Sequence, residues 1–382
     1  MSWRKYWHAK EFVQTESGRF CAYHGGSRDS KVSLVLLHGA GYSGLTWSTL
    51  GENLASLADT RLLALDLRGH GETEISYEEG SQELDMSGER MARDVVEVLL
   101  GLYTDTDLGV VIMGHSMGGA LAAMVAEMMA GMEKGPKLLG LVVEDVVEGT
   151  AMEALAGMHT VLQNRPKQFQ GLEQAVEWAV RSGQVRNVES ARVSVPGQVV
   201  TEAGELVARL IEDFREEDEE ANSQDPAKRE KVDNSDSIQE EEEDTEPNGD
   251  FKMPKAPEAE PAVDRTPPET FTGSQVLRWR IDLSRTEPHW SGWFKGLSQR
   301  FLSAPGARLL LLAGVDRLDK ELTVGQMQGK FQMQVLPQVG HTVHEDSPDR
   351  VAEVLAGFLI RNKFCQPLED FSPTLPGCTF HI

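Results

Sequence analysis

Runs of apolar residues alternate with segments of helical spacing along the first 150 positions. The four runs, which are almost continuously apolar, are Val32–Leu37, Arg61–Leu65, Val110–Met113 and Leu138–Val143. Such runs are typical of strands that are buried on both faces. Between them, residues 45–57, 89–102 and 119–132 carry apolar side chains at helical spacing. The alternation predicts an α/β fold, in which helices cover both faces of a mostly parallel central sheet.

Shorter elements flank this region on both sides. Residues 10–25 predict two short strands around the Ser17-Gly18 turn. Towards the C-terminus, Arg308–Ala313 and Met333–Pro337 predict two further strands, and Asp349–Arg361 predicts a closing amphipathic helix. The core is therefore predicted in two parts, residues 1–149 and 274–382.

The alternation stops between these two parts. Residues 150–212 carry helical patterns, which predict a helical cap inserted over the site. Residues 213–273 are charged, contain prolines and have few large apolar side chains, so we expect a disordered acidic loop. Most of the net charge of −24 lies there, because residues 211–270 contain 22 Asp or Glu and 7 Lys or Arg.

Composition excludes several classes of protein. The predicted globular part is mildly acidic and has no basic footprint for a phosphate backbone, so nucleic-acid binding is not expected. The longest apolar run, Leu309–Val315, is too short to cross a membrane. Residues 1–10 do not resemble a secretory signal, and the three cysteines (Cys21, Cys365 and Cys378) lie far apart. We therefore expect a cytoplasmic or nuclear protein that is not secreted.

A pentapeptide after the third run carries the strongest chemical signal. Gly114-His115-Ser116-Met117-Gly118 is a G-x-S-x-G motif that directly follows a predicted strand and precedes a predicted helix. The chemistry needs a serine on a sharp strand-to-helix turn, so that its hydroxyl projects into the site, and small residues on either side. Ser116 is therefore the candidate nucleophile, and the backbone N–H of Met117 is a candidate oxyanion donor.

The loop after the first run admits two interpretations. His38-Gly39-Ala40-Gly41 lies where a hydrolase of this type places its second oxyanion donor, and the N–H of Ala40 is the candidate. Residues 39–44 also spell G-x-G-x-x-G, and Asp66 follows 22 residues after Gly44, as in a dinucleotide-binding domain. The second interpretation leaves Ser116 unexplained, so we favour the first.

The base is predicted at His341, in a loop between the last predicted strand and the closing helix. An imidazole suits this role because its pKa of about 6.5 lets it accept and return a proton near neutral pH. The acid has two candidates: Asp316 follows the strand Arg308–Ala313, and Asp145 follows the preceding strand. Spacing alone slightly favours Asp316. His38, His70 and His115 lie in tight turns, where we expect them to hydrogen-bond to backbone, and His344 is expected to be a supporting or surface group. No spacing predicts zinc.

The alternation of strands and helices, the elbow, and the order of serine, acid and histidine along the chain together predict the α/β-hydrolase fold. The chemistry would be that of a serine esterase, with an acyl-enzyme intermediate and no metal or organic cofactor.

Several longer strings resemble the protein phosphatase methylesterase family. They are Asp145–Met152, Gln184–Arg192, Trp290–Phe294 and the stretch from Leu309 through Gly325–Gln332 to His341. The resemblance covers residues 30–212 and 275–365 and is far more specific than the elbow alone. It implies that Ser116, Asp145 and His341 form the triad, which replaces the preference for Asp316 as the acid.

The resemblance also implies a substrate, the methyl ester on the C-terminal leucine of the protein phosphatase 2A catalytic subunit. Residues 207–212, followed by the acidic loop, are similar to short motifs that dock on regulatory subunits of this phosphatase. A cap helix followed by a solvated loop is the simpler interpretation of that segment. Two alternative functions remain at this stage: an esterase of the same fold acting on lipid or small-molecule esters, and a binding protein that sequesters the phosphatase with little turnover.

Overall fold

The structure is a computed structural model that describes residues 1–76, 84–104, 107–212, 275–314, 318–368 and 371–372. Contacts divide the chain into one compact unit, Met1–Ile211 with Gly273–Ile382, and a second unit, Glu212–Thr272. Only the first is described below. The predicted acidic loop (213–273), Asp316 and Cys378 lie outside the described residues. The domain boundaries predicted from the sequence stay predictions.

Nine strands of the described chain form the central sheet, in the order β1-β2-β4-β3-β6-β7-β10-β11, with β5 paired to β2. Their bounds are β1 Ala9–Thr15, β2 Gly18–Gly26, β3 Val32–Leu37, β4 Arg61–Leu65, β5 Glu74–Ile75, β6 Gly109–His115, β7 Lys137–Glu144, β10 Ala307–Leu312 and β11 Gln332–Val335. All neighbours from β4 to β11 pair in parallel, whereas β1 and β5 pair antiparallel with β2, and β2 pairs antiparallel with β4. The predicted mostly parallel sheet is confirmed.

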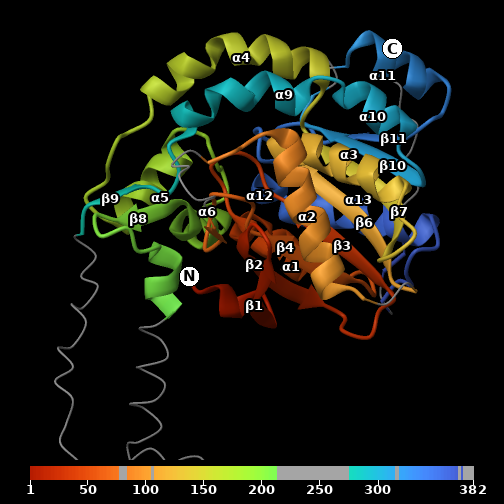
Figure 1. Cartoon of the computed structure of the whole chain (residues 1–382), viewed down its shortest axis with the longest axis horizontal. Coiled ribbons are helices and arrows are strands. Elements are labelled where there is room, and N and C mark those ends of the chain that lie inside the picture. The colour runs from red at the N-terminus through yellow and green to blue at the C-terminus, as the bar shows by residue number, and fades with distance from the viewer. Residues whose placement is uncertain (77–83, 105–106, 213–274, 315–317, 369–370, 373–382) are drawn as a thin grey trace, which may run out of the picture. The chain divides into compact units, whose positions relative to one another are not determined.

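Alternate side chains of each central strand enter two different cores. In β3, Val35 and Leu37 join one cluster, while Leu34 and Leu36 join the other. The first cluster includes α2 (Gly88–Leu102) and α3 (Met117–Ala130), and the second includes α1 (Ser48–Ala55) and α13 (Pro348–Arg361). The strands are apolar on both faces because each face is covered by helices (Figure 1).

Register brings the ends of three parallel strands to the same edge of the sheet. Leu37 at the end of β3 pairs with Gly114 in β6, and His115 pairs with Glu144 at the end of β7. The loops that follow these strands therefore start side by side. This edge carries the predicted chemistry, as expected for ligand sites at the carboxyl ends of parallel strands.

The segments on either side of the acidic loop form further elements. They are α4 (Glu148–Gln163), α5 (Leu172–Arg181), α6 (Val188–Ser194), η3 (Val195–Gln198) and β8 (Val199–Thr201), then β9 (Leu277–Trp279), η4 (Leu283–His289), α9 (Trp290–Phe294), α10 (Leu297–Ser303), α11 (Lys320–Met327) and α12 (Val343–Asp346). The helix α4 packs along α9 (Figure 1).

Residues 150–212, the predicted cap, are mainly helical, as the sequence predicts, with one difference. The strands β8 and β9 form a separate antiparallel pair, Val199–Thr201 against Leu277–Trp279. Neither strand was predicted, because three residues are too few to show a periodic pattern. The pairing joins chain segments that are more than 70 positions apart.

Candidate active site

Ser116 occupies a strained turn between β6 and α3. Its φ of 53° and ψ of −119° lie outside the conformations that side-chain-bearing residues ordinarily adopt. The backbone N–H of Ser116 donates to the carbonyl of Glu144, 3.0 Å away, which anchors the turn to the end of β7. Its hydroxyl does not cap α3, although Ser116 is the N-cap residue. Ser116 is half-buried, and its hydroxyl is therefore left for other chemistry.

The glycines of the motif are required by close backbone contacts. A Cβ on Gly114 would overlap the carbonyl oxygen of Gly118, and a Cβ on Gly118 would overlap the carbonyl oxygens of Leu37 and His38. Because these neighbours are backbone atoms, they cannot move aside. The sequence-based expectation that both positions must be small is confirmed.

Asp145 and His341 are in direct contact. The Asp145 side chain is fully buried after β7, and its Oδ2 lies 2.8 Å from Nδ1 of His341. Its other oxygen, Oδ1, accepts the backbone N–H of Ala313 at 2.9 Å. A carboxylate on Nδ1 holds the imidazole in the tautomer that leaves Nε2 free to accept a proton. The other candidate acid, Asp316, lies outside the described residues.

The loop that carries His341 lies against the turn that carries Ser116. Nε2 of His115, the residue before Ser116, is 2.9 Å from the carbonyl oxygen of His341, and the two imidazole rings are 4.7 Å apart. The described residues show no hydrogen bond between the Ser116 hydroxyl and the His341 imidazole. The imidazole is about half exposed, with 51% of the side chain accessible, so it borders a solvent-accessible site.

Neighbouring groups fix the His341 loop from the cap side. The buried carboxylate of Asp346 accepts the N–H of Gly340 at 2.6 Å and that of Arg186 at 2.7 Å. The hydroxyl of Thr342 donates to the carbonyl of Gln184 at 2.6 Å. The base is therefore placed by backbone contacts on both sides.

In the described part of the chain, the two candidate oxyanion donors are backbone N–H groups without an acceptor. Neither the N–H of Ala40 nor that of Met117 donates to an acceptor in the described part of the chain. A Cβ on Gly39, next to Ala40, would lie 3.4 Å from the Cβ of Ser116. The loop after β3 therefore approaches the serine turn closely, as an oxyanion hole requires.

Two neutral histidines hold this loop. Nε2 of His38 accepts the N–H of Leu67 at 3.0 Å, so its Nδ1 carries the proton and donates to Gly39 O at 2.8 Å. Nε2 of His70 accepts the N–H of Gly41 at 2.9 Å. Burial lowers the pKa of His70 to about 4 and lowers that of His38 well below its usual value. The predicted backbone hydrogen bonds of His38, His70 and His115 are confirmed.

The sequence does not predict a buried ion pair that lies next to the site. Glu144 and His344 are both fully buried, with Oε1 of Glu144 2.9 Å from Nδ1 of His344 and 2.8 Å from its backbone N. The His344 ring stacks on Trp47 at 4.0 Å. Burial disfavours the imidazolium, but the Glu144 carboxylate outweighs this effect and raises the pKa of His344. The pair supports the turn that begins at Glu144 and ends at Asp145.

Asp66, the residue that suggested dinucleotide binding, is used structurally. Its buried carboxylate accepts the N–H of Gly44 at 2.7 Å and that of Glu72 at 2.8 Å. Burial raises the pKa of Asp66 to about 7, against the effect of these two hydrogen bonds. An acid buried among backbone donors cannot also bind a ribose, so the G-x-G-x-x-G pattern here is a structural loop.

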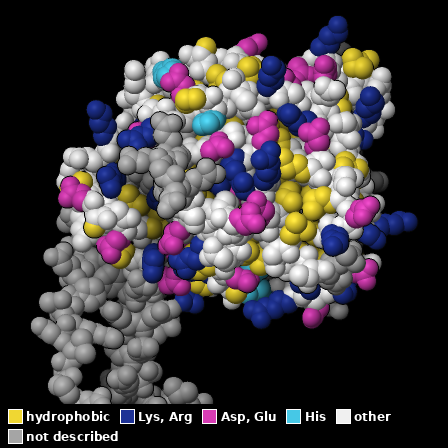
Figure 2. All heavy atoms as spheres, in the orientation of Figure 1, with side chains coloured by type: hydrophobic (Ala, Val, Ile, Leu, Met, Phe, Trp, Pro, Cys, Tyr) yellow, Lys and Arg dark blue, Asp and Glu magenta, His cyan; other side chains and the backbone are white. Residues whose placement is uncertain are grey.

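Other kinds of site are not evident within the described residues. No three His, Cys, Asp or Glu side chains gather there as a metal site would need. None of the helices in the described ranges is both long enough and apolar enough to span a membrane. On the face shown in Figure 2, Lys and Arg side chains are interspersed with Asp and Glu.

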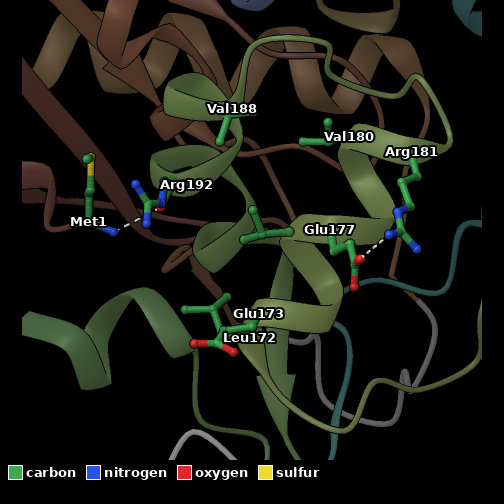
Figure 3. A pocket seen from close by; sticks show the side chains of 9 residues that line it. Met1, Leu172, Glu173, Glu177, Val180, Arg181, Val188 and Arg192 are labelled. Atoms are coloured by element: carbon green, nitrogen blue, oxygen red, sulfur yellow. Dashed lines mark hydrogen bonds and ion pairs between the residues drawn. The ribbon is translucent and has the colours of Figure 1, made fainter.

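A cavity of about 480 Å³ lies elsewhere, between α5 and α6 (Figure 3). It is lined by valines of these helices, Val176, Val180 and Val188, and by charged side chains that include Arg192. Glu177 and Arg181 form an ion pair at its edge. None of the predicted site residues lines this cavity.

Comparison with known proteins agrees with the geometry. Residues 34–354 match the model of the alpha/beta hydrolase family. Protein phosphatase methylesterase 1 of Mus musculus is 45% identical over 98% of this chain and 88% of its own length. The chain belongs to the protein phosphatase methylesterase family. The Aspergillus oryzae member is 37% identical over 95% of this chain and 71% of its own length.

Solved structures support the fold of this methylesterase-family protein. The crystal structure of E-2-(acetamidomethylene)succinate hydrolase superposes with a TM-score of 0.58 and 14% identity, covering 92% of this chain and 99% of that one. An esterase from Mycobacterium tuberculosis gives a TM-score of 0.53 and 19% identity, covering 92% of each chain. The predicted α/β-hydrolase fold is confirmed, and this member of the methylesterase family is a serine hydrolase.

Proposed function

We propose that this protein hydrolyses the methyl ester on the C-terminal leucine of the protein phosphatase 2A catalytic subunit. The products would be a free C-terminal carboxylate and methanol. The observation that carries the proposal is the 45% identity over 98% of the chain with a protein phosphatase methylesterase. The contact between Asp145 and His341 beside the serine turn supports it.

In the first half of the proposed reaction, Ser116 is the nucleophile. Its hydroxyl oxygen attacks the ester carbonyl carbon while Nε2 of His341 accepts the hydroxyl proton. The negative charge that develops on the carbonyl oxygen is stabilised by the N–H groups of Ala40 and Met117, which have no other acceptor in the described chain. His341 then returns the proton to the methoxy oxygen, and methanol leaves.

In the second half, water replaces the serine. His341 accepts a proton from the water molecule, whose oxygen attacks the acyl carbon. The resulting intermediate collapses and releases the leucine carboxylate, and the proton returns to the Ser116 oxygen. Asp145 stabilises the imidazolium that forms in each half. No metal or organic cofactor takes part in these steps.

We limit the proposed partner to the catalytic subunit. Residues 207–212, the segment similar to docking motifs, are helical, and the side chains of Val207 and Ala208 are buried at 0% and 6% exposure. A docking motif has to offer its apolar side chains to a partner, and these two already pack inside this protein. The acidic loop lies outside the described residues.

We also propose that the protein works in the cytoplasm or the nucleus. Cys21 is buried and Cys365 is partly buried, and both are free thiols. Free thiols are typical of reducing compartments.

Release of methanol from the methylated catalytic subunit tests the proposal. The wild-type protein should release one methanol per subunit, and Ser116→Ala should reduce the rate by roughly 10³- to 10⁶-fold. Ser291→Ala, at an exposed serine of α9, is the control and should retain the wild-type rate.

Three outcomes would contradict this account. Full activity of Ser116→Ala would exclude Ser116 as the nucleophile. Hydrolysis of small esters, without hydrolysis of the methylated subunit, would indicate an esterase with another substrate. Stable binding of the subunit without methanol release would indicate a sequestering protein.

A further inference from the structure

A cationic side chain from the segment after α4 lies against the candidate oxyanion loop. Nη1 of Arg165 is 3.7 Å from the position that a Cβ on Gly41 would take. A methyl carbon of Leu283 lies 3.1 Å from the same position. Since Gly41 directly follows Ala40, the guanidinium borders the loop that carries one of the two candidate oxyanion donors.

The guanidinium is held in place by a tryptophan. The central carbon of Arg165 lies 3.8 Å from the centroid of the Trp279 ring. The indole N–H of Trp279 donates to the carbonyl of Pro166 at 2.8 Å, and its ring packs edge-on against Phe169 and Trp178 at 5.1 and 5.4 Å. A fixed platform leaves the planar group with little freedom to lose when it binds a ligand.

Among the residues that the structure describes, Arg165 has no counter-ion. Within the described ranges, the guanidinium forms no ion pair and no hydrogen bond. The backbone N–H of Arg165 donates to the carbonyl of Leu162. The side chain is half-buried, and burial lowers the pKa of Arg165 while the nearby Tyr42 opposes the change. A cation partly removed from water without an anion is costly to keep, unless a bound molecule supplies the anion.

The position of Arg165 relates it to the acyl side of a substrate. Gly39 borders Ser116, and Gly41 borders Arg165, at the two ends of a three-residue segment. Adjacent residues advance by at most about 3.6 Å, so with the contacts of 3.4 and 3.7 Å at the two ends, the guanidinium lies within roughly 15 Å of the serine turn. A peptide whose ester carbonyl lies at Ser116 spans such a distance in at most about four residues. The carboxylate produced by hydrolysis would form at the serine end, away from Arg165.

We propose that Arg165 forms a carboxylate subsite that binds an acidic side chain of the substrate peptide, two to four residues before the methylated leucine. The inference rests on the proposed function, because it needs a peptide methyl ester in the site. A methyl group offers little to recognise on the alcohol side, so specificity has to come from the peptide. The flat fork of a guanidinium matches a carboxylate with two parallel hydrogen bonds.

Paired peptide substrates test the subsite. Each pair consists of two N-acetylated hexapeptide leucine methyl esters that differ only in Asp or Asn, placed two, three or four residues before the leucine. For at least one pair, the wild-type kcat/KM for the Asp peptide should exceed that for the Asn peptide by about tenfold or more, mainly through KM. The ratio within a pair does not depend on how much of the enzyme is folded.

Substitutions assign the ratio to Arg165. Arg165→Gln should bring it close to one, and Arg165→Lys should give an intermediate ratio because a lysine keeps the charge without the planar fork. Arg181→Gln, which removes an exposed arginine of α5 that pairs with Glu177, should keep the wild-type ratio.

The two proposals fail in different ways. Hydrolysis of both members of every pair at equal kcat/KM by the wild-type protein would overturn the subsite alone. A preference for Asp that survives in Arg165→Gln would also overturn it. If the wild-type protein hydrolysed no leucine methyl ester, whether peptide or whole subunit, the proposed function would fail and the subsite with it.

Discussion

At the scale of single residues, the candidate site depends on two strained positions that follow adjacent strands. Ser116 and Asp145 have positive φ values of 53° and 48°. Both lie directly after the strands β6 and β7, whose last residues pair with each other. Each turn starts at the same edge of the sheet, and the loop after β11 brings His341 into contact with Asp145 and with His115, the residue before Ser116.

The sequence could identify two of these three residues from local signals. The glycines around Ser116 and the place of His341 before the last helix are local patterns. Asp145 and Asp316 could not be separated, because both follow parallel strands and the choice depends on which turn faces His341. The contact at 2.8 Å shows that the Asp145 turn does so.

The choice of acid can be measured directly. Asp145→Asn should keep the side-chain shape but favour the wrong imidazole tautomer, lowering kcat by about 10⁴-fold. Asp316→Asn is the matched comparison and should change kcat by much less. Steady-state rates with a methylated substrate decide between them. The opposite order of effects would assign the role of the acid to Asp316.

At the scale of elements, the elbow is held by backbone-to-backbone packing. The start of α3 approaches the end of β3 so closely that Gly118 has no room for a Cβ. Helix and strand can therefore take this arrangement only with glycine at the contact. The same contact brings the turn that carries Met117 close to the loop that carries Ala40.

Two glycine substitutions should separate this contact from a general glycine effect. Gly118→Ala forces a Cβ against fixed carbonyl oxygens, and we expect it to lower the free energy of unfolding by about 1–3 kcal/mol or more. Gly157→Ala, in α4 where nothing lies within 4 Å, should raise it by up to about 1 kcal/mol. Denaturant unfolding monitored by circular dichroism gives both values. Equal effects at the two positions would contradict the packing argument.

At the scale of the whole molecule, the sequence predicted the layers and missed the buried charges. Continuous apolar strands and amphipathic helices follow from local periodicity, so the two-sided sheet could be predicted. Glu144, His344 and Glu345 are all fully buried, whereas charged residues are expected at the surface. Their burial depends on packing between α12, η2 (Gly44–Trp47) and β7, which no local pattern shows.

The buried carboxyl group of Glu345 should make stability depend on pH. Burial raises the pKa of Glu345 to about 7, although His344 opposes the change. In the unfolded chain the carboxyl group ionises near pH 4.5, so between about pH 4.5 and 7 the folded state binds more protons. The free energy of unfolding should therefore fall as pH rises through this window. His344, whose pKa is also raised, contributes stability that is lost as pH rises.

Glu345→Gln should reduce this loss. The variant lacks the ionisable group, so its free energy of unfolding should fall by roughly 2 kcal/mol less than that of the wild type between pH 5 and pH 8. Glu353→Gln, at an exposed position of α13, is the control and should follow the wild-type profile. Chemical denaturation at a series of pH values provides the comparison. Parallel profiles for wild type and Glu345→Gln would show that Glu345 does not titrate in this range.

The most direct test of the central claim is to locate the activated hydroxyl. A fluorophosphonate forms a covalent bond with a serine whose proton is taken by a neighbouring base, and peptide mass spectrometry locates the adduct. We predict one adduct per chain, on Ser116, with no adduct in Ser116→Ala and much slower labelling in His341→Gln. An adduct on another residue, or equal labelling of wild type and Ser116→Ala, would contradict the assignment of Ser116 and His341.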